Sequence, residues 1–425
     1  MTFADSAPKE GFRLSQLIYD TRYRSYTIQV IVLLILLAVL VWLVNNTIAN
    51  LAVRGKDINF DFLWSRAGYD IGQTLIPYTN DSTHGRALVI GLLNTLLVAV
   101  LASIFATILG VFVGILRLSN NWLVARLMTV YVEVFRNIPL LLWIILVFVI
   151  LGETRPGPKD FKVTQEMIDA GQQPAASMWF WDSVAVTNRG TNIPRPLLEH
   201  GLGGFQILGV PINFSVIATF AVLAASIWAN VLLRRRAAAV QEATGSRPTT
   251  WWKSILILVV PTVVLLMAMG FHLEYPELKG FNFQGGILVF HSLTALLVAL
   301  TLYSATYIAE AVRAGVQAIS RGQTEAAYAL GLRPGRTMNL VILPQALRVI
   351  IPPLISQYLN ITKNTTLGMA ISYMDLKGTL GGITLNQTGR ELECMLLMML
   401  IYLTLSLLIS AVMNVYNNAV RLKER

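Results

Sequence analysis

Long apolar runs separated by charged segments are the main feature of this sequence. A helix needs about 20 mostly apolar residues to cross the hydrocarbon core of a bilayer. Eight stretches fit or approach this requirement: residues 28–44, 87–116, 127–151, 201–233, 254–271, 281–309, 349–362 and 394–420. Stretch 349–362 is the shortest, because its 14 residues reach only about 21 Å as a helix. The pattern predicts an all-α, polytopic membrane protein with about eight transmembrane helices.

The first apolar stretch follows several cations and therefore has the charge pattern of a secretory signal. It is longer than the usual apolar core of a signal peptide, and no clear cleavage site follows it. We therefore predict that residues 28–44 are retained as a membrane helix.

The composition agrees with a membrane location. Ala, Val, Ile, Leu, Met, Phe, Trp, Tyr and Cys make up 55% of the 425 residues, whereas Asp, Glu, Lys and Arg make up only 13%. That charged share is about half of what a soluble domain carries. A soluble protein with so few charges could not cover its surface, which excludes disorder, a coiled coil and an ordinary cytosolic enzyme.

The excess of positive charge indicates how the chain crosses the membrane. The sequence carries 33 Lys and Arg against 23 Asp and Glu, a formal net charge of +10. With the N-terminus in the cytosol, more than half of these cations fall in cytosolic segments, among them the triplet Arg234, Arg235 and Arg236. Such an excess is typical of cytosolic loops. We therefore predict a multi-pass protein with both termini in the cytoplasm, and nucleic acid is not needed as a partner to explain the charge.

No catalytic or metal-binding pattern is recognisable. The Gly55-Lys56 pair lacks the upstream glycine of a phosphate-binding loop. The four histidines are scattered, without the i, i+3 or i, i+4 spacing of helical metal ligands. No paired carboxylates in the apolar stretches suggest a proton- or sodium-coupled carrier. We therefore predict that the chain is not an enzyme and has neither catalytic residues nor a metal site.

Two single residues inside apolar stretches are candidates for chemistry. Cys394 is the one cysteine, and we interpret it as a small buried apolar side chain. His291 lies where an ionisable group is costly. We interpret it as a neutral histidine hydrogen-bonded between helices, with a proton relay as the alternative.

A polar segment, residues 322–346, has the pattern of two short helices joined by a break. Thr324 and Glu325 suit a helix start, because the helix dipole favours an acid there. Gly331 suits a left-handed stop and Pro334 the first turn of the next helix. We expect Pro344 and the Pro352-Pro353 pair to interrupt the return into the membrane. The alternative is an ordinary amphipathic loop between membrane helices.

The same segment resembles a motif of a known family. Glu325-Ala326-Ala327, Gly331 and Ile342-Leu343-Pro344 are similar to the EAA loop of ABC importer permeases. Further matches resemble the polar amino-acid (His/Glu/Gln) permease group, and they comprise residues 94–96, 131–141, 307–315, 322–327, 343–348, 351–353 and 363–367 with Gly110 and Gly114. The resemblance covers about residues 91–151 and 286–420. It implies the fold of a type I ABC importer transmembrane domain (MetI-like).

The layout is larger than is usual for this group and resembles the Q-type permease of general L-amino-acid importers. We predict a region 1–85 with a cytosolic N-terminus, an extra membrane helix and a periplasmic loop. The permease core would comprise 86–151 and 285–425, with the EAA coupling loop at about 322–345. Between them, 152–284 would be an insertion with a periplasmic loop and two extra membrane helices. Gly110 and Gly114 would form a small-residue face for helix packing.

The resemblance also implies roles for individual residues. The loop would form a coupling helix that sits in a cleft of the ATPase subunit and transmits its closure as a rigid-body motion. The residues carrying this role are Gly322, Gln323, Glu325, Ala326, Ala327 and Gly331. A polar substrate path would include Arg136, Glu310, Arg313, Lys363, Asn364 and Thr365. As alternatives, Glu310 and Arg313 could pair at the membrane interface, and Arg136 and Lys363 could cap helix ends.

Together these features predict a permease subunit of an ATP-driven importer for L-amino acids in a bacterial inner membrane. The implied partners are a homologous second permease, a cytosolic ABC ATPase dimer, a periplasmic amino-acid-binding protein and the lipid membrane, without nucleic acid. No cofactor is expected on this chain, because ATP and Mg would be bound by the ATPase. The alternative is an ion-coupled secondary amino-acid carrier. An intramembrane enzyme is disfavoured by the missing nucleophile–base and metal spacings.

Overall fold

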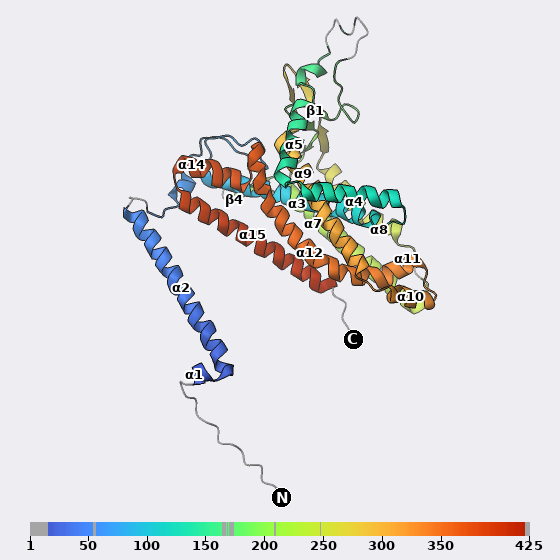
Figure 1. Ribbon diagram of the computed structural model, residues 1–425. Coiled ribbons are helices and arrows are strands. Elements are labelled where there is room, and N and C mark those ends of the chain that lie inside the picture. Colours follow the sequence, from blue (N-terminus) through green and yellow to red (C-terminus); the bar gives the residue numbers. More distant parts are fainter. Residues whose placement is uncertain are drawn as a thin grey trace. The chain divides into compact units, whose positions relative to one another are not determined.

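The computed structural model describes residues 16–53, 57–163, 167, 169, 174–207, 210–246 and 248–420. The chain divides into two compact units, one ending at Asp61 and one beginning at Phe62. Figure 1 labels the helices and strands along the chain.

The first unit contains a short helix, α1 (Gln16–Tyr19), and a long one, α2 (Thr21–Val53). With 33 residues, α2 is about 50 Å long, which exceeds the ~30 Å hydrocarbon core of a bilayer. The most apolar window of α2 has no buried residue in the part of the chain that the structure describes. The predicted helix at 28–44 is therefore confirmed as a helix that is long and apolar enough to cross a membrane.

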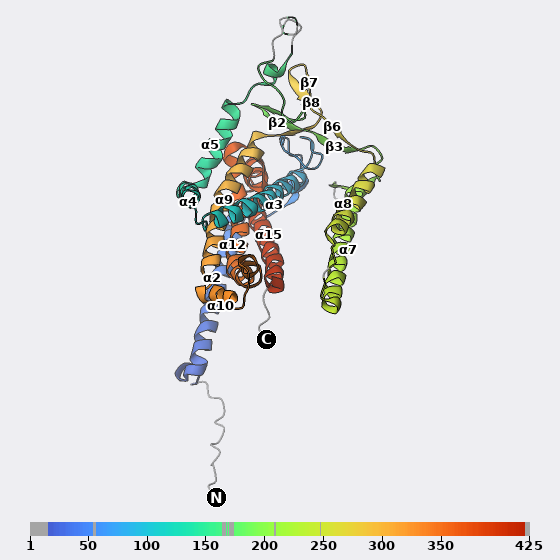
Figure 2. The same cartoon turned by 90° about the vertical axis from the view of Figure 1, so that its right-hand side faces the viewer.

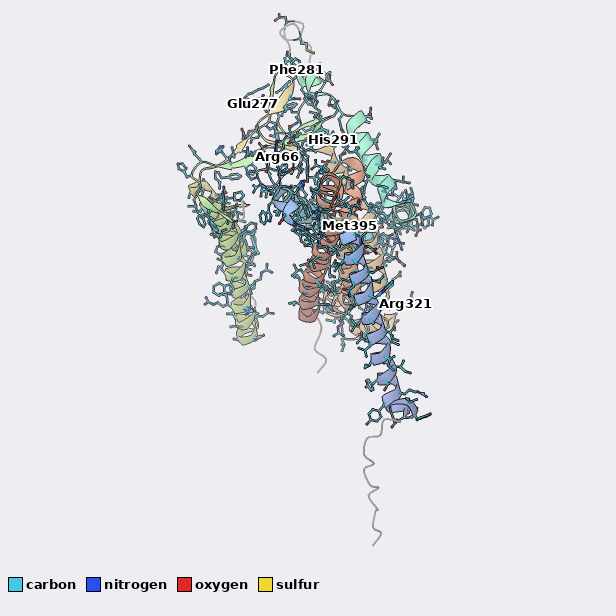
Figure 3. All side chains as sticks on the ribbon, turned by 90° about the vertical axis from the view of Figure 1, so that its left-hand side faces the viewer. Arg66, Glu277, Phe281, His291, Arg321 and Met395 are labelled. Carbon is cyan, nitrogen blue, oxygen red and sulfur yellow. The ribbon has the colours of Figure 1, made fainter. Side chains whose placement is uncertain are left out.

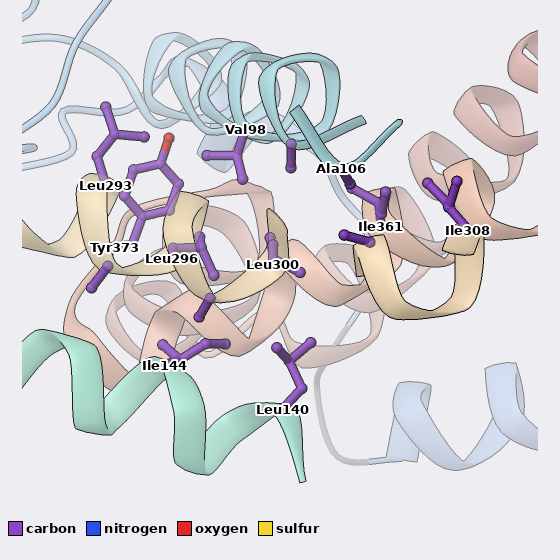
Figure 4. Packing of buried hydrophobic residues seen from close by; sticks show 14 of the residues in the cluster. Val98, Ala106, Leu140, Ile144, Leu293, Leu296, Leu300, Ile308, Ile361 and Tyr373 are labelled. Carbon is purple, nitrogen blue, oxygen red and sulfur yellow. The ribbon is translucent and has the colours of Figure 1, made fainter. Parts of the chain in front are cut away.

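Four helices form the core of the second unit: α3 (His84–Leu116), α5 (Leu140–Glu153), α9 (His291–Gln317) and α12 (Leu343–Asn364). The central helix is α9, which contacts the other three. Its buried residues include four alanines and a glycine, together with larger side chains such as Leu296 and Leu300. Figure 4 shows these leucines in one cluster with Val98 of α3 and Ile144 of α5. Small side chains let membrane helices approach closely, which favours packing where no water drives association.

Two glycines set the distance between α3 and α9. A Cβ atom added at Gly110 would lie 2.6 Å from Cβ of Ile308, and one at Gly114 would lie 2.8 Å from the carbonyl oxygen of Ala309. Both distances are too short for a larger residue. The expected packing role of Gly110 and Gly114 is therefore confirmed.

The predicted helix at 127–151 is two helices rather than one. The first, α4 (Trp122–Asn137), meets α5 at an angle of 103°. Between them Ile138 is extended, with φ −101° and ψ 133°, and Pro139 follows. Proline disfavours the helical conformation of the residue before it and lacks an N–H group. The apolar stretch is therefore divided, because Pro139 ends α4 and lets a new helix begin.

The prolines near residue 350 do not interrupt the chain as expected. Pro344 lies in the first turn of α12, where its missing N–H group costs nothing. Pro352 and Pro353 lie inside α12, and both are exposed. Proline is tolerated within membrane helices where neighbouring groups satisfy the backbone. Stretch 349–362 is therefore the middle of a continuous helix of 22 residues.

A series of short turns connects α12 to the last long helix, α15 (Glu391–Val420). These turns are η4 (Thr365–Ile371), α13 (Leu376–Gly378), η5 (Thr379–Thr384) and α14 (Leu385–Thr388). Both α13 and η5 contact α3, and α15 contacts α12. The turns are thus packed onto the core.

The segment between α5 and α9 contains a helix pair and short strands. The helices α7 (Phe214–Thr244) and α8 (Trp251–Ala268) pack on each other. The strands are β1 (Ala185–Thr187), β2 (Gly190–Ile193), β3 (Arg195–Leu198), β4 (Gly204–Ile207), β5 (Val210–Asn213), β6 (Phe271–Glu274), β7 (Glu277–Lys279), β8 (Asn282–Gln284) and β9 (Ile287–Val289). They form one three-stranded antiparallel sheet, β1-β2-β9, and the pairs β3-β6, β4-β5 and β7-β8. The short 3-10 turns η1 (Asp61–Trp64) and η2 (Pro158–Phe161) complete the connecting segments before β1.

Two predicted helices therefore begin later than their apolar stretches. The stretch starting at 201 first forms β4 and β5, and the stretch starting at 281 first forms β8 and β9. A short apolar run fits a buried strand as well as a helix, so the pattern could not distinguish them.

Within the described residues, seven helices are long and apolar enough to cross a membrane, or eight if α4 and α5 form one span. This agrees with the prediction of about eight, and the spans are all helical. The strands lie at one end of the second unit, where α9 begins, and α10 (Arg321–Ala329) lies at the opposite end, where α9 has ended (Figure 2). We call these ends the strand end and the loop end. The predicted divisions at 86, 152 and 285 stay predictions.

Candidate functional site

The loop end carries the segment that we predicted to couple with an ATPase. Its first helix, α10, is closed by Gly331, which has a left-handed φ of +76°. The N–H of Gly331 donates to the carbonyl of Tyr328, and the N–H of Leu332 donates to that of Ala327. These two bonds are a Schellman motif. The predicted stop at Gly331 is therefore confirmed, and it gives the end of α10 a fixed geometry.

The start of α10 lies three residues before the predicted one. The helix begins at Arg321, after Ser320 with extended backbone at φ −63° and ψ 143°. Thr324 and Glu325 therefore lie in the second turn, so the expectation that they start the helix was wrong. The Ser320 side chain makes no capping bond, and its extended backbone alone marks the start.

The second short helix of this segment, α11 (Pro334–Thr337), begins as predicted, with Pro334 in its first turn. One turn of π-helix, η3 (Met338–Ile342), then leads directly into α12. The buried side chains of the segment include Ala327 in α10 and Thr337 in α11. The short helix α11 is thus joined to α12 through η3 without intervening coil, and α10 contacts both α11 and η3.

The outer surface of α10 is exposed and partly apolar. Glu325 and Ala326 are exposed, as are Gly322 and Gln323, whereas Ala327 is only 3% exposed. Leu330, next to the Gly331 stop, is 81% exposed. Small side chains beside a protruding leucine let another protein approach the helix backbone closely. The shape and composition of this surface suit contact with another protein.

Glu310 and Arg313 belong to a charge cluster that joins two helices. Glu310 Oε2 lies 2.5 Å from Nη1 of Arg117, which caps the end of α3. Arg313 also pairs with Glu310, and it donates to Gln317 at 2.6 Å. The side chain of Arg117 is only 9% exposed. The pair predicted at i and i+3 therefore exists, and the structure adds Arg117, which bonds α3 to α9 near the loop end.

Arg136, at the end of α4, lies over an aromatic side chain of α9. Its guanidinium carbon is 5.0 Å from the ring centre of Tyr307, which is the geometry of a cation–π contact. The hydroxyl of Tyr307 lies 2.9 Å from that of Tyr303. Tyr307 and Glu310 are one turn apart, so Arg136 and the charge cluster are neighbours along α9.

Lys363, Asn364 and Thr365 lie elsewhere, at the end of α12. Lys363 is exposed and Asn364 half-buried, whereas Thr365 is buried. The hydroxyl of Thr365 donates to Asp375 Oδ2 at 3.2 Å, and the N–H of Gly378 donates to Oδ1 at 2.9 Å. Burial raises the pKa of the Asp375 carboxyl to about 6, against these hydrogen bonds, which lower it. The predicted path residues thus fall into two regions, one along α9 and one around Asp375.

Asn94 and Thr95 fasten the turn around Asp375 to α3. The side-chain amide of Asn94 donates to the carbonyls of Gln73, at 2.9 Å, and Met374, at 2.8 Å. The N–H of Leu376 donates to the Thr95 hydroxyl at 3.1 Å. The bonds with Met374 and Leu376 link positions 280 and 281 apart and hold the turn in place.

The sequence reasoning did not assign roles to Arg117, Asp375 and Asn94. Arg117 was counted only as a cation, and Asp375 has no pattern that distinguishes it from a loop acid. Asn94 offered the best signal, since it lies in a matching motif and is a polar residue inside an apolar stretch.

The predictions for His291 and Cys394 differ in how they compare with the structure. His291 is buried as expected, but its Nε2 lies 2.8 Å from the backbone carbonyl oxygen of Thr187 in β1. The expectation of a bond between helices was therefore wrong, because His291 is the first residue of α9 and meets the strand end. Cys394 is buried, as predicted. No group of three or more His, Cys, Asp or Glu that could hold a metal ion occurs among the residues searched, which are the described ones.

Comparison with known proteins gives one family match. The family described as "binding-protein-dependent transport system inner membrane component" matches residues 251–422.

Two curated relatives span the whole chain. A glutamate/glutamine/aspartate/asparagine transport system permease protein, BztB of Rhodobacter capsulatus, is 67% identical over 426 residues and covers 100% of both chains. A general L-amino acid transport system permease protein, AapQ of Rhizobium johnstonii, is 41% identical over 98% of this chain and 96% of its own.

A third relative matches over a shorter region. The permease protein BztC, of the same-named transport system in Rhodobacter capsulatus, is 38% identical over 117 residues, which is 27% of this chain and 25% of its own.

Proposed function

Because the chain belongs to the family of binding-protein-dependent transport system inner membrane components, we propose that it forms part of the membrane path of an ATP-driven importer for L-amino acids. The observation that carries the proposal is the exposed surface of α10, a helix that ends at Gly331 and contacts α11 and η3, which lead into the core helix α12. The chain is thus a multi-span permease subunit of an ABC transporter.

The substrate class follows from the relatives. The relative that is 67% identical over the full length is named for glutamate, glutamine, aspartate and asparagine. The relative at 41% is named for L-amino acids in general. We infer that this chain serves L-amino acids and that acidic amino acids and their amides are preferred.

The importer has further subunits in this proposal. BztB and BztC carry the name of one transport system, and both are similar to this chain, which supports a homologous second permease as partner. An ABC ATPase dimer would dock on α10, and a periplasmic binding protein would deliver the amino acid. ATP and Mg would be bound by the ATPase, so that this chain transports without catalysing a reaction of its own.

The charge cluster explains how motion at the loop end reaches the membrane. Movement of α10 would be transmitted to α11 and η3, which α10 contacts, and from there to α12, because α11, η3 and α12 follow one another without coil. The contact of α12 with α9, and the Glu310–Arg117 pair between α9 and α3, would carry it across the core. Alternating access would then follow as a rigid-body movement of packed helices.

We further propose that the loop end faces the cytoplasm and the strand end the periplasm. Arg313, Arg321, Arg333 and Arg336 lie near the loop end, and cytosolic loops of inner membrane proteins are enriched in Lys and Arg. Both termini would then be cytoplasmic. The ion-coupled secondary carrier is not favoured, because relatives over the whole chain are permeases of ABC transport systems.

The coupling role can be tested by reversing the charge of Glu325. Glu325 is exposed, so Glu325→Lys leaves the core packing intact but puts a cation on the docking surface. We expect amino-acid uptake and substrate-stimulated ATP hydrolysis by the reconstituted importer to fall about tenfold or more, which corresponds to ~1.4 kcal/mol of lost coupling.

The matched control is Glu242→Lys, at an exposed position near the end of α7. It makes the same charge change outside α10, and we expect uptake to be unchanged. Stimulated hydrolysis that stays at the wild-type rate in Glu325→Lys would contradict the coupling role.

A further inference from the structure

A cavity of about 350 Å³, lined by apolar and polar side chains, lies at the strand end of the core. Phe148 of α5, Phe290 and His291 at the start of α9, and Tyr373 in the turn after α12 line it. Figure 3 labels His291 at the place where the core helices meet the strand region. The cavity is within the size range of small-molecule sites.

Segments outside the predicted permease core complete this cavity. Gln73 comes from the connection before α3, and Asn188 and Arg189 come from the turn between β1 and β2. The N–H of Phe290 donates to Gln73 Oε1 at 3.4 Å, so the connection before α3 is fastened to the start of α9. The extra segments therefore add polar side chains at one end of the core helices.

Two positive features meet in the cavity. The first turn of any helix has N–H groups without partners within the helix, and its dipole favours an anion. Phe290 precedes α9 and makes no side-chain capping bond. Arg189 lines the same cavity, and its guanidinium donates one of its N–H groups to Asn282 Oδ1, which holds it in position.

His291 supplies an unused acceptor at the same place. Its side chain is 6% exposed, and Nε2 must carry the proton because it faces the carbonyl oxygen of Thr187 at 2.8 Å. In a neutral imidazole the other nitrogen then accepts hydrogen bonds. That atom, Nδ1, is buried and has no hydrogen-bond partner among the described residues. A buried polar atom without a partner is costly, which is a reason to expect a ligand donor beside it.

We propose that this cavity is an outer subsite that holds a free L-amino acid before it enters the membrane path. The α-carboxylate would lie between the first turn of α9 and the guanidinium of Arg189. The α-ammonium would donate to Nδ1 of His291 once the imidazole ring turns toward the cavity, because Nδ1 is otherwise shielded. The inference rests on the proposed function, because it takes the substrate to be an amino acid. It assigns the segments outside the permease core a role in binding the substrate directly.

Cysteine protection in the assembled importer tests the subsite. Cys394 is the one native cysteine of this chain and is buried, so an introduced thiol is the reactive one. Ser372 is exposed and lines the cavity, and Ser372→Cys can be labelled with a neutral maleimide. We expect L-glutamine to slow labelling at least about fivefold. The derivative in which the α-carboxylate of glutamine is converted to an amide (the α-carboxamide) should have no effect, because it lacks the anion that the site would bind.

Three controls make the result specific. Ser65→Cys is also exposed and lies outside the cavity, and L-glutamine should leave its labelling unchanged. Adding Arg189→Gln to Ser372→Cys should abolish the protection. Adding Arg195→Gln, which changes an exposed arginine of β3, should retain it.

Several outcomes would overturn the subsite. They are equal protection by the α-carboxamide, protection that survives Arg189→Gln, and protection by the unliganded binding protein instead of the amino acid. Uptake of radiolabelled L-glutamine is measured in parallel with the wild-type importer reconstituted into vesicles. Uptake without protection would remove the subsite alone, whereas absence of uptake would remove the proposed function.

Discussion

At the residue scale, a few polar side chains determine which helices are linked. Glu310 bonds to Arg117 and so joins α9 to α3, while Asn94 and Thr95 fasten the turn around Asp375 to α3. Such bonds are costly to break, because the partner left behind is largely shielded from water. They are the points at which a single substitution should have the largest effect.

The Glu310–Arg117 pair should contribute measurably to stability. We expect Glu310→Leu to destabilise the protein by about 2 kcal/mol, because it removes the carboxylate beside an Arg117 side chain that is only 9% exposed. The measurement is the Tm of the purified importer in detergent. Adding Arg117→Leu should restore part of the loss, since the buried unpaired charge is then removed, while the more exposed Arg313 keeps its hydrogen bond to Gln317.

The control for this pair is Glu277→Leu. Glu277 pairs with Lys279, but the two side chains are 69% and 60% exposed, so the change should stay within about 0.5 kcal/mol. Equal Tm values for the Glu310 and Glu277 variants would contradict the role given to the cluster.

At the element scale, close helix contacts and defined helix ends shape the second unit. Gly110 and Gly114 bring α3 against α9, Pro139 divides α4 from α5, and Gly331 ends α10. Glycine allows the close contact at Gly110 and Gly114 and the positive φ at Gly331, and proline ends the helix at Pro139. The long helices would otherwise be straighter and further apart.

The contact at Gly110 should not tolerate an added methyl group. We expect Gly110→Ala to destabilise the protein by about 1–3 kcal/mol, because the new Cβ would lie 2.6 Å from Cβ of Ile308 and 2.8 Å from the carbonyl oxygen of Ala305. Thermal unfolding of the purified importer measures the loss.

Gly152→Ala is the matched control for Gly110→Ala. A Cβ at Gly152, near the end of α5, would have nothing within 4 Å. Alanine is also the better helix former, so its Tm should be unchanged or higher. A Gly110→Ala variant as stable as Gly152→Ala would show that α3 and α9 are further apart than described.

At the scale of the whole molecule, the second unit has two chemically different ends. The loop end carries the exposed surface of α10 and several arginines, and the strand end carries the short sheets and the cavity lined by His291. The helices between them are mostly apolar on their outer faces. This arrangement suits a protein that receives a solute at one end and a driving subunit at the other.

Membrane orientation can be tested with two serine positions. An impermeant maleimide added to intact cells should label Ser65→Cys, before α3, but not Ser246→Cys, between α7 and α8. Both positions are exposed, and the positive-inside rule places Ser246 near the cytosolic triplet that starts at Arg234. Both should be labelled after lysis, whereas labelling of Ser246→Cys in intact cells would reverse the proposed orientation.

The number of spans and the coupling segment could be predicted from local sequence. Membrane spans depend on the length of an apolar run, which is visible in the sequence. The stop at Gly331 and the start at Pro334 depend on the backbone preferences of single residues. The bend at Pro139 also has a local cause, but the apolar run around it concealed the break.

What the sequence by itself determined is thus the membrane location, about eight spans, the two short helices of the loop and the family. Only the tertiary structure decided that Glu310 pairs with Arg117, that Thr365 meets Asp375, and that Arg189 and His291 share a cavity. The physical reason is distance along the chain. Arg117 and Glu310 are 193 positions apart, and Thr187 and His291 are 104 apart. Such contacts depend on how the helices pack, and no local pattern of apolar and polar residues specifies that packing.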